Sequence, residues 1–136
     1  MAIKAVKNYE SFNFLVDLVL FPFDIMVSLG ESDDELKNKL IELGSDDMED
    51  IGRLLNLDST VKGRTIMLKG HQTVVRMPIV PKNAFDYGIL QHEIFHAVEF
   101  ILYKIGITHD LDTSNELYAY MIGYVTGEVY KKLGFK

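Results

Sequence analysis

Two histidines and a glutamate stand close together in the second half of the chain and could hold and use a metal ion. They form His92-Glu93-Ile94-Phe95-His96, the pattern H-E-x-x-H. Residues four apart lie on one face of an α-helix, so both imidazoles could reach a single ion. Glu93 would project beside that ion and could take a proton from a bound water. With nine Glu and four His among 136 residues, accident would produce this pattern with a probability of roughly 0.8%.

A catalytic zinc site needs a third protein ligand, with water in the fourth position. The chain has no Cys, so that ligand must be His, Asp or Glu. Glu116 is the best candidate: it follows His96 by 20 residues, and an antiparallel helix would bring it back beside the histidines. Thr113-x-x-Glu116 fits a capping box equally well, which would make this glutamate a helix start only. Nearby competitors, which could instead be exposed loop residues, are His109, Asp110 and Asp112.

The histidine pair also has a structural interpretation. The surrounding segment is strongly apolar, and burying an unpaired imidazole is costly, so both rings need polar partners. Carbonyl or carboxylate groups on a helix flank would satisfy them without a metal. In that case the chain would be a metal-free helical binding module.

The elements that must position the motif are predicted by spacing and by stop signals. A long helix from about Ala84 to Ile105 carries the motif and ends at Gly106. A last helix runs from about Ser114 to Leu133. Before them, a hairpin is expected around the turn-like Lys69-Gly70-His71-Gln72, with strands at Thr65–Leu68 and Thr73–Met77.

The first half of the chain predicts four elements. We expect a mostly buried helix over about Tyr9–Leu20, ended by Pro22, and then a short strand at Ile25–Ser28. Ser32 and Glu35 form a capping box for a helix that ends at Gly44. Ser45 is expected to cap another helix. Its apolar face would comprise Met48, Ile51, Leu54 and Leu55. Helices around a small sheet indicate an α+β fold, in one domain over residues 1–136.

Composition excludes several classes of protein and of site. The net charge is −6 and the sequence pI is about 5.1, which speaks against a nucleic-acid partner. Without Cys there are no disulfides and no thiolate catalysis. The apolar run 12–23 is too short to cross a membrane and contains Asp17 and Pro22. No signal-peptide cleavage site follows it, so we expect a cytoplasmic setting and no membrane partner. The acidic runs 32–35 and 45–50 lack EF-hand spacing and are expected to be helix starts.

The motif followed by Asn115-Glu116-x-x-Ala119 resembles the gluzincin branch of the zincin metallopeptidases, the thermolysin-like pattern HExxH-x19-E. The resemblance covers roughly residues 65–133. It implies a minimal zincin-like domain, in which a small mixed sheet with an edge hairpin packs on the motif helix and a glutamate-bearing helix follows. It also implies hydrolysis of a peptide or protein substrate, with Glu93 as the catalytic base. The residues that it implies as Zn²⁺ ligands are His92, His96 and Glu116.

Three features depart from that family. Tyr120 stands where thermolysin-like enzymes place an Asp that supports a zinc-bound His, and no His follows Glu116 to bind an oxyanion. Tyrosines could donate to the oxyanion instead, although at this spacing they are more often packing residues. The candidates are Tyr118, Tyr120 and Tyr124. At 136 residues there is room for the zinc-binding half of such an enzyme, and no second lobe is expected.

A looser resemblance links almost the whole chain to the small HExxH proteins encoded among tailed-phage structural genes. The segments that carry it are 21–26, 87–93 and 118–124. It implies an alternative function, as a structural or assembly component of a virion with a zincin fold and little or no activity. Its partners would then be other virion proteins, and it would lie in the host cytoplasm or the virion. Substrate, cleavage preference and oligomeric state stay open.

Overall fold

A four-stranded mixed sheet forms the middle layer of the protein. The computed structural model describes residues 10–69 and 72–136, and within them the chain is α+β. The strands and helices, in chain order, are β1 Phe12–Asp17, β2 Asp24–Leu29, α2 Asp33–Glu42, α3 Met48–Gly52, β3 Arg64–Met67, β4 Thr73–Met77, α4 Ala84–Lys104 and α5 Asn115–Lys132.

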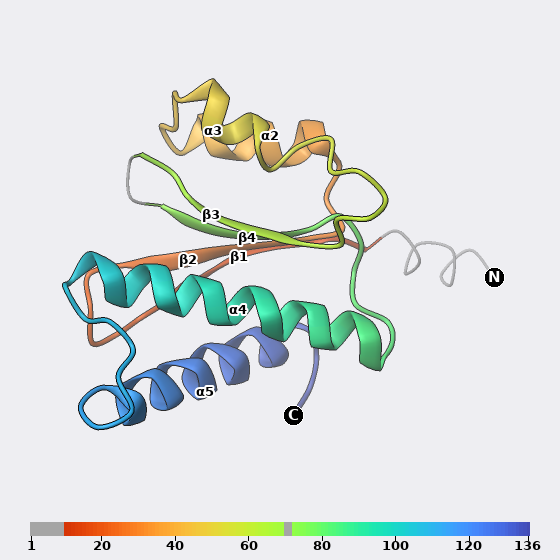
Figure 1. Ribbon diagram of the computed structural model, residues 1–136. Coiled ribbons are helices and arrows are strands. Elements are labelled where there is room, and N and C mark those ends of the chain that lie inside the picture. The colour runs from red at the N-terminus through yellow and green to blue at the C-terminus, as the bar shows by residue number, and fades with distance from the viewer. Residues whose placement is uncertain (1–9, 70–71) are drawn as a thin grey trace.

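The helices cover the two faces of this sheet unequally. The short helices α2 and α3 lie on one face, while the long helices α4 and α5 lie on the other (Figure 1). The strand order is β1-β2-β4-β3, with β2 and β4 parallel and both outer pairs antiparallel. Consequently β3, which precedes the motif helix in the chain, is an edge strand that lies beside it.

The central strand β4 shows why the sheet is covered on both sides. All five of its residues are buried. Val75 and Met77 belong to the apolar cluster under α4 and α5, while Val74 belongs to the cluster under α2 and α3. Alternate side chains of a strand point to opposite faces, so a strand that is buried along its whole length needs a layer on each face.

The helix expected over Tyr9–Leu20 is wrong, and Tyr9 lies outside the described residues. The segment forms β1, an edge strand antiparallel to β2 along its whole length. An apolar residue on the outer side, Leu15, is 46% exposed and masks the alternation in the sequence. Pairing with β2 decides the conformation, because inward and outward side chains then alternate. The inward residues, which belong to the cluster with α4 and α5, are Phe12, Phe14 and Val16.

Most of the other elements are confirmed. The capping box of Ser32 and Glu35 begins α2, and β3 pairs with β4 as the expected hairpin. The turn residue His71 lies outside the described residues. One helix differs: Asp47, not Ser45, begins α3, since its side chain accepts a hydrogen bond from the Asp50 backbone N–H at 3.1 Å. The acidic runs are thus helix starts, as expected. The apolar face expected for α3 is wrong in part, because α3 ends at Gly52 before Leu54 and Leu55, and Met48 is 50% exposed.

Helices α4 and α5 begin and end within one residue of their predicted bounds. Each is followed by a glycine with positive φ, Gly106 at 82° and Gly134 at 101°, the usual way to end a helix. Among the described residues, no helix combines the length and the apolar character that crossing a membrane would need.

Candidate metal centre

Helix α4 brings the two histidines of the motif together on its outer flank. Its inner face packs on the sheet through residues such as Leu90 and Ile94, which leaves His92 66% and His96 37% exposed. The two Nε2 atoms lie 3.1 Å apart, with the rings edge to face. The one-face arrangement expected from the four-residue spacing is therefore present.

This distance matches two ligands of one ion. Nitrogen atoms at about 2.0–2.1 Å from a tetrahedral zinc lie about 3.4 Å from each other. Without an ion, the same approach of His92 and His96 fits a hydrogen bond between one protonated and one unprotonated nitrogen. With or without an ion, the Nε2 atoms of the two rings are directed toward the space between them, and a metal site needs this arrangement.

Glu93 is held from the other side by the edge strand β3. Its side chain is only 8% exposed. The Thr65 hydroxyl lies 2.7 Å from Oε1 and donates to it, while Oε2 lies 4.0 Å from Nε2 of His92. A charge-assisted hydrogen bond on one oxygen fixes the carboxylate and leaves the other oxygen toward the histidines. Sequence reasoning missed Thr65, because its partner lies 28 residues further along the chain.

Gly63, just before β3, makes room for this glutamate. A Cβ atom at that position would lie 3.0 Å from Cγ of Glu93 and 3.2 Å from Cγ2 of Ile89. Contacts that short force a neighbour to move. A residue with a side chain would therefore displace Glu93 or widen the gap between β3 and α4.

A second carboxylate, Glu99, contacts the outer nitrogen of His96. The distance from Nδ1 of His96 to Oε1 of Glu99 is 3.4 Å. Histidine ligands of metals usually donate their other N–H to such a group, which orients the ring. The sequence contained a signal for this contact, since residues three apart on a helix are neighbours. Glu99 is therefore a carboxylate placed beside the His96 ring, which Tyr120 of α5 is not.

Glu116 is exposed in the first turn of α5 and is not brought to the histidines. Among residues 10–69 and 72–136, no group of three or more His, Asp or Glu side chains is placed to hold a metal ion. Helix α4 continues eight residues beyond His96, or about 12 Å. Alongside it, Thr126 of α5 contacts Gln91 at 3.1 Å, so the start of α5 lies toward the far end of α4. Glu116 as third ligand stays a prediction.

The capping-box alternative for Glu116 is wrong. Ser114 occupies the cap position of α5, and no side chain makes a cap hydrogen bond there. The Ser114 hydroxyl instead donates to the Thr108 carbonyl at 2.6 Å, which shapes the connection from α4.

The competing ligands also serve this connection. Asp110 accepts hydrogen bonds from the backbone N–H groups of Asp112 and Thr113, and these bonds lower the pKa of its carboxyl group. His109 contacts Asn115 at 3.0 Å and packs edge to face on Tyr118. The side chains of Asp110 and His109 are thus engaged locally, and the backbone of Asp112 takes part in the same connection after α4.

In two of the three candidate tyrosines the hydroxyl group already donates a hydrogen bond to a backbone carbonyl. Tyr118 donates to the Ile107 carbonyl at 3.2 Å, and Tyr124 donates to the Asp17 carbonyl at 3.0 Å. Burial raises the pKa of both phenols. Tyr120 is exposed and lines a small pocket with Leu18 and Val19, on the β1 side of α5. The packing interpretation fits these side chains better than oxyanion binding.

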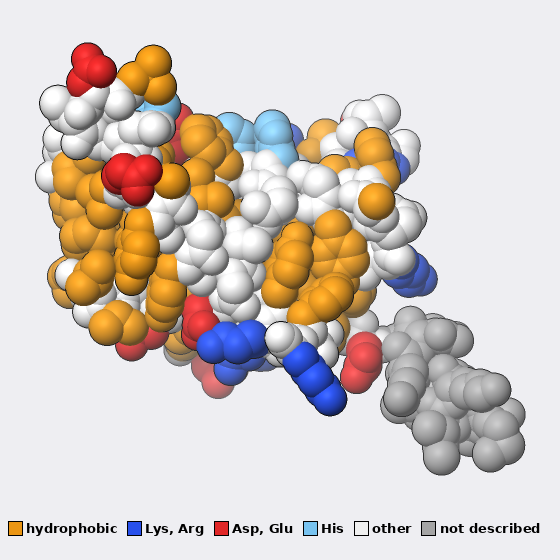
Figure 2. Space-filling view, turned by 90° about the horizontal axis from the view of Figure 1, so that it is seen from below, with side chains coloured by type: hydrophobic (Ala, Val, Ile, Leu, Met, Phe, Trp, Pro, Cys, Tyr) orange, Lys and Arg blue, Asp and Glu red, His pale blue; other side chains and the backbone are white. Residues whose placement is uncertain are grey.

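Two cavities flank the histidine pair along α4. An open groove of about 650 Å³ reaches from Glu93 to Phe85 and is walled by residues 60–63 before β3. A cavity of about 340 Å³ lies at the other end of the helix, beyond Glu99. The histidines therefore stand between two hollows on one continuous surface. Histidine side chains reach the margin of the face formed by α5 and α4 (Figure 2).

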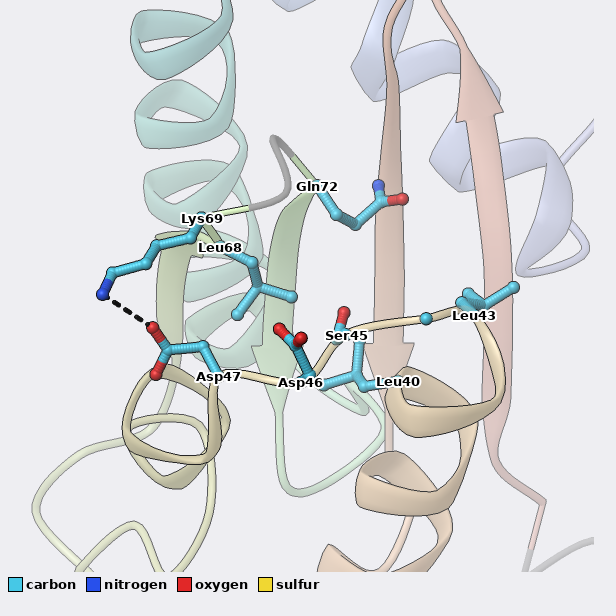
Figure 3. A pocket seen from close by; sticks show the side chains of 9 residues that line it. Leu40, Leu43, Ser45, Asp46, Asp47, Leu68, Lys69 and Gln72 are labelled. Atoms are coloured by element: carbon cyan, nitrogen blue, oxygen red, sulfur yellow. Dashed lines mark ion pairs between the residues drawn. The ribbon is translucent and has the colours of Figure 1, made fainter.

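A separate cavity of about 180 Å³ lies on the opposite side of the sheet, between α2, α3 and the hairpin (Figure 3). An ion pair of 3.0 Å between Lys69 and Asp47 lies at this cavity. The backbone hydrogen bond from Asp50 and the bond from Lys69 lower the pKa of Asp47. Its carboxylate is therefore already engaged in capping α3 and pairing with lysine.

Comparisons with protein-family models, with curated proteins and with solved structures find no match to this chain.

Proposed function

We propose that this protein is a zinc-dependent hydrolase of peptide bonds, with a minimal zincin-like arrangement of sheet and helices. One observation carries the proposal. The Nε2 atoms of His92 and His96 lie 3.1 Å apart, while Oε2 of Glu93 stands 4.0 Å from the first of them. Two converging imidazoles with an adjacent carboxylate beside an open groove are three of the groups that metal-assisted hydrolysis uses, and a third metal ligand is the one still required.

The residues present fit two of the four coordination positions of a zinc ion. His92 and His96 would hold the ion, and Glu99 would orient the second imidazole. Zinc bound there would lower the pKa of a bound water to about 7 and polarise a carbonyl. The third protein position is kept for Glu116, on the sequence spacing alone.

The chain's own contribution is to position and move a proton. Oε2 of Glu93 is placed to accept the proton of the attacking water and to return it to the leaving amine. The Thr65 hydroxyl holds the other oxygen during both transfers. Strand β3 is an outer strand of the sheet, so an extended peptide could pair with it beside α4.

Metal analysis of protein purified without chelators tests the proposal. We expect about one zinc per chain in the wild type and none in His92→Ala. Glu93→Gln should retain the zinc and lose hydrolysis of a peptide library. A zinc-free wild-type chain would overturn the proposal.

A virion structural or assembly component is a second candidate, favoured by an exposed apolar surface. Val19 is 75% and Leu20 64% exposed at the β1–β2 turn, next to Tyr120 of α5, and apolar side chains spread widely over this side of the protein (Figure 2). Such surfaces often mark protein contacts. Under this alternative Glu93→Gln would preserve every function, including assembly into a particle.

A further inference from the structure

The cavity beyond Glu99 has the size and the walls of a binding pocket. Its volume of about 340 Å³ falls within the roughly 300–1,000 Å³ of small-ligand sites. It lies between the second half of α4 and the connection to α5. Its lining is mostly aromatic: Glu99, Phe100, Tyr103, Thr108, His109 and Tyr118.

Two of these rings form a fixed wall. His109 packs edge to face on Tyr118 with ring centroids 4.9 Å apart, and the Tyr118 hydroxyl is tied to the Ile107 carbonyl. Tyr103 is 67% exposed and stands at the opening. The wall is therefore built before any ligand arrives, and ligand binding has to order only the outer ring.

The only Asp, Glu, Lys or Arg side chain in the lining is Glu99. It is 44% exposed, and its contact with His96 uses one carboxylate oxygen, Oε1. The segment 105–116, which supplies Thr108 and His109 to the lining, contains three further carboxylates and no Lys or Arg. Lys104 lies over the Phe23 ring at 4.5 Å, so its ammonium group faces another part of the protein.

Aromatic faces and a carboxylate together favour a cation. Lysine and arginine side chains bind over aromatic rings, and arginine also forms strong hydrogen bonds with a carboxylate. We propose that this cavity binds a lysine or arginine side chain of the peptide on which the metal centre acts. The proposal rests on the proposed function for that peptide, while binding of the basic side chain can be measured without the metal.

The cavity lies on one side of the histidine pair, so the preference for a basic side chain applies to that side only. Glu99 lies about one helical turn beyond His96 and contacts its Nδ1 at 3.4 Å, so a basic side chain bound there lies beside the metal centre. The groove on the other side contains Lys62 and no carboxylate except Glu93. The two sides of the metal centre thus differ in charge, and only the Glu99 side selects a basic residue.

Binding to the metal-free full chain tests the pocket apart from catalysis. The probes are Nα-acetyl-arginine amide and Nα-acetyl-citrulline amide, which share shape and differ in charge, followed through backbone amide NMR shifts. We expect the arginine probe to shift the signals of residues 99–103 and 107–109, and to bind roughly tenfold more tightly than the citrulline probe.

Two variants locate the effect. Glu99→Gln should abolish the preference for arginine over citrulline, and Tyr103→Ala should weaken both probes. Asp112→Asn is the matched control, because it removes one negative charge from an exposed residue outside the lining; it should keep the preference.

Three results would overturn the proposal: equal binding of the two probes, no binding of either, or the same loss in Asp112→Asn as in Glu99→Gln. None of these results touches the zinc content that tests the proposed function. Conversely, a zinc-free chain that still prefers arginine would overturn the hydrolase and retain the pocket.

Discussion

Two glutamates that the sequence assigns to one site occupy opposite environments. Glu93 is almost fully buried between α4 and β3, and the Thr65 hydroxyl fixes one of its oxygens. Glu116 is exposed at the start of α5. The difference teaches that spacing within one helix predicts which side chains lie together. Spacing across a connection does not, because the result also depends on where each helix ends and how the two helices pack. The predictions below test this contrast, beginning with the largest expected effect.

Glu93→Gln should reduce peptide hydrolysis by roughly 10²–10⁴-fold, the usual contribution of a general base. An amide cannot accept the proton, although it keeps the shape of the side chain. Turnover of a peptide library and zinc content should be measured together, with Asp112→Asn as the control for the loss of one exposed carboxylate. If Glu93→Gln keeps the turnover of the wild type, the role of the buried glutamate fails.

His96→Ala should weaken zinc binding by more than roughly 100-fold, because it removes a ligand. Removing a group that only hydrogen-bonds to a ligand usually costs about 10–100-fold. Glu116→Ala should cost less than His96→Ala if its side chain stays apart from the histidines when zinc binds, as it does in the structure. Competition with a chromogenic chelator measures both affinities. Equal losses would show that zinc draws the first turn of α5 to the motif, as the sequence spacing predicts.

Glu99→Gln should weaken zinc binding by roughly tenfold, because the contact with Nδ1 of His96 orients the ring. The amide can still accept a hydrogen bond but carries no charge. The same competition assay applies, and Asp112→Asn is the matched change of charge. A zinc affinity equal to that of the wild type would assign the contact to packing alone.

Thr65→Val should lower the turnover number by roughly tenfold and leave zinc affinity unchanged, since it removes a hydrogen bond to a charged group. Thr65→Ser keeps the hydroxyl and should restore turnover. Rescue by serine separates the positioning role from a general loss of packing. If valine and serine behave alike, the hydroxyl does not position Glu93.

The smallest expected effect is on stability, and it comes from Asp110 in the connection before α5. Hydrogen bonds from Asp112 and Thr113 lower the folded-state pKa of Asp110 below its ordinary value of 3.8. Its stabilising contribution is therefore complete above that value and is lost as the pH falls through the lower, folded pKa. Thermal unfolding of the metal-free chain should show Asp110→Asn slightly less stable near neutral pH, and the gap should close in strong acid. A gap independent of pH would contradict this role.

The helices α2, α4 and α5 were predictable because their signals are local. A capping box begins α2, a glycine follows α4 and α5, and the apolar spacing between these limits is helical. The first strand was not predictable in this way. Its conformation is decided by pairing with β2, and the exposed Leu15 hides the alternation that would have revealed it.

By itself, the sequence determined that His92 and His96 share a helix flank with Glu93 beside them, because the helical repeat acts over four residues. Only the tertiary structure decided that Thr65 anchors Glu93 and that Glu116 stands apart. Both outcomes depend on where β3 and α5 pack against α4. Packing of that kind sums many contacts between segments distant in sequence, so no single spacing reveals it.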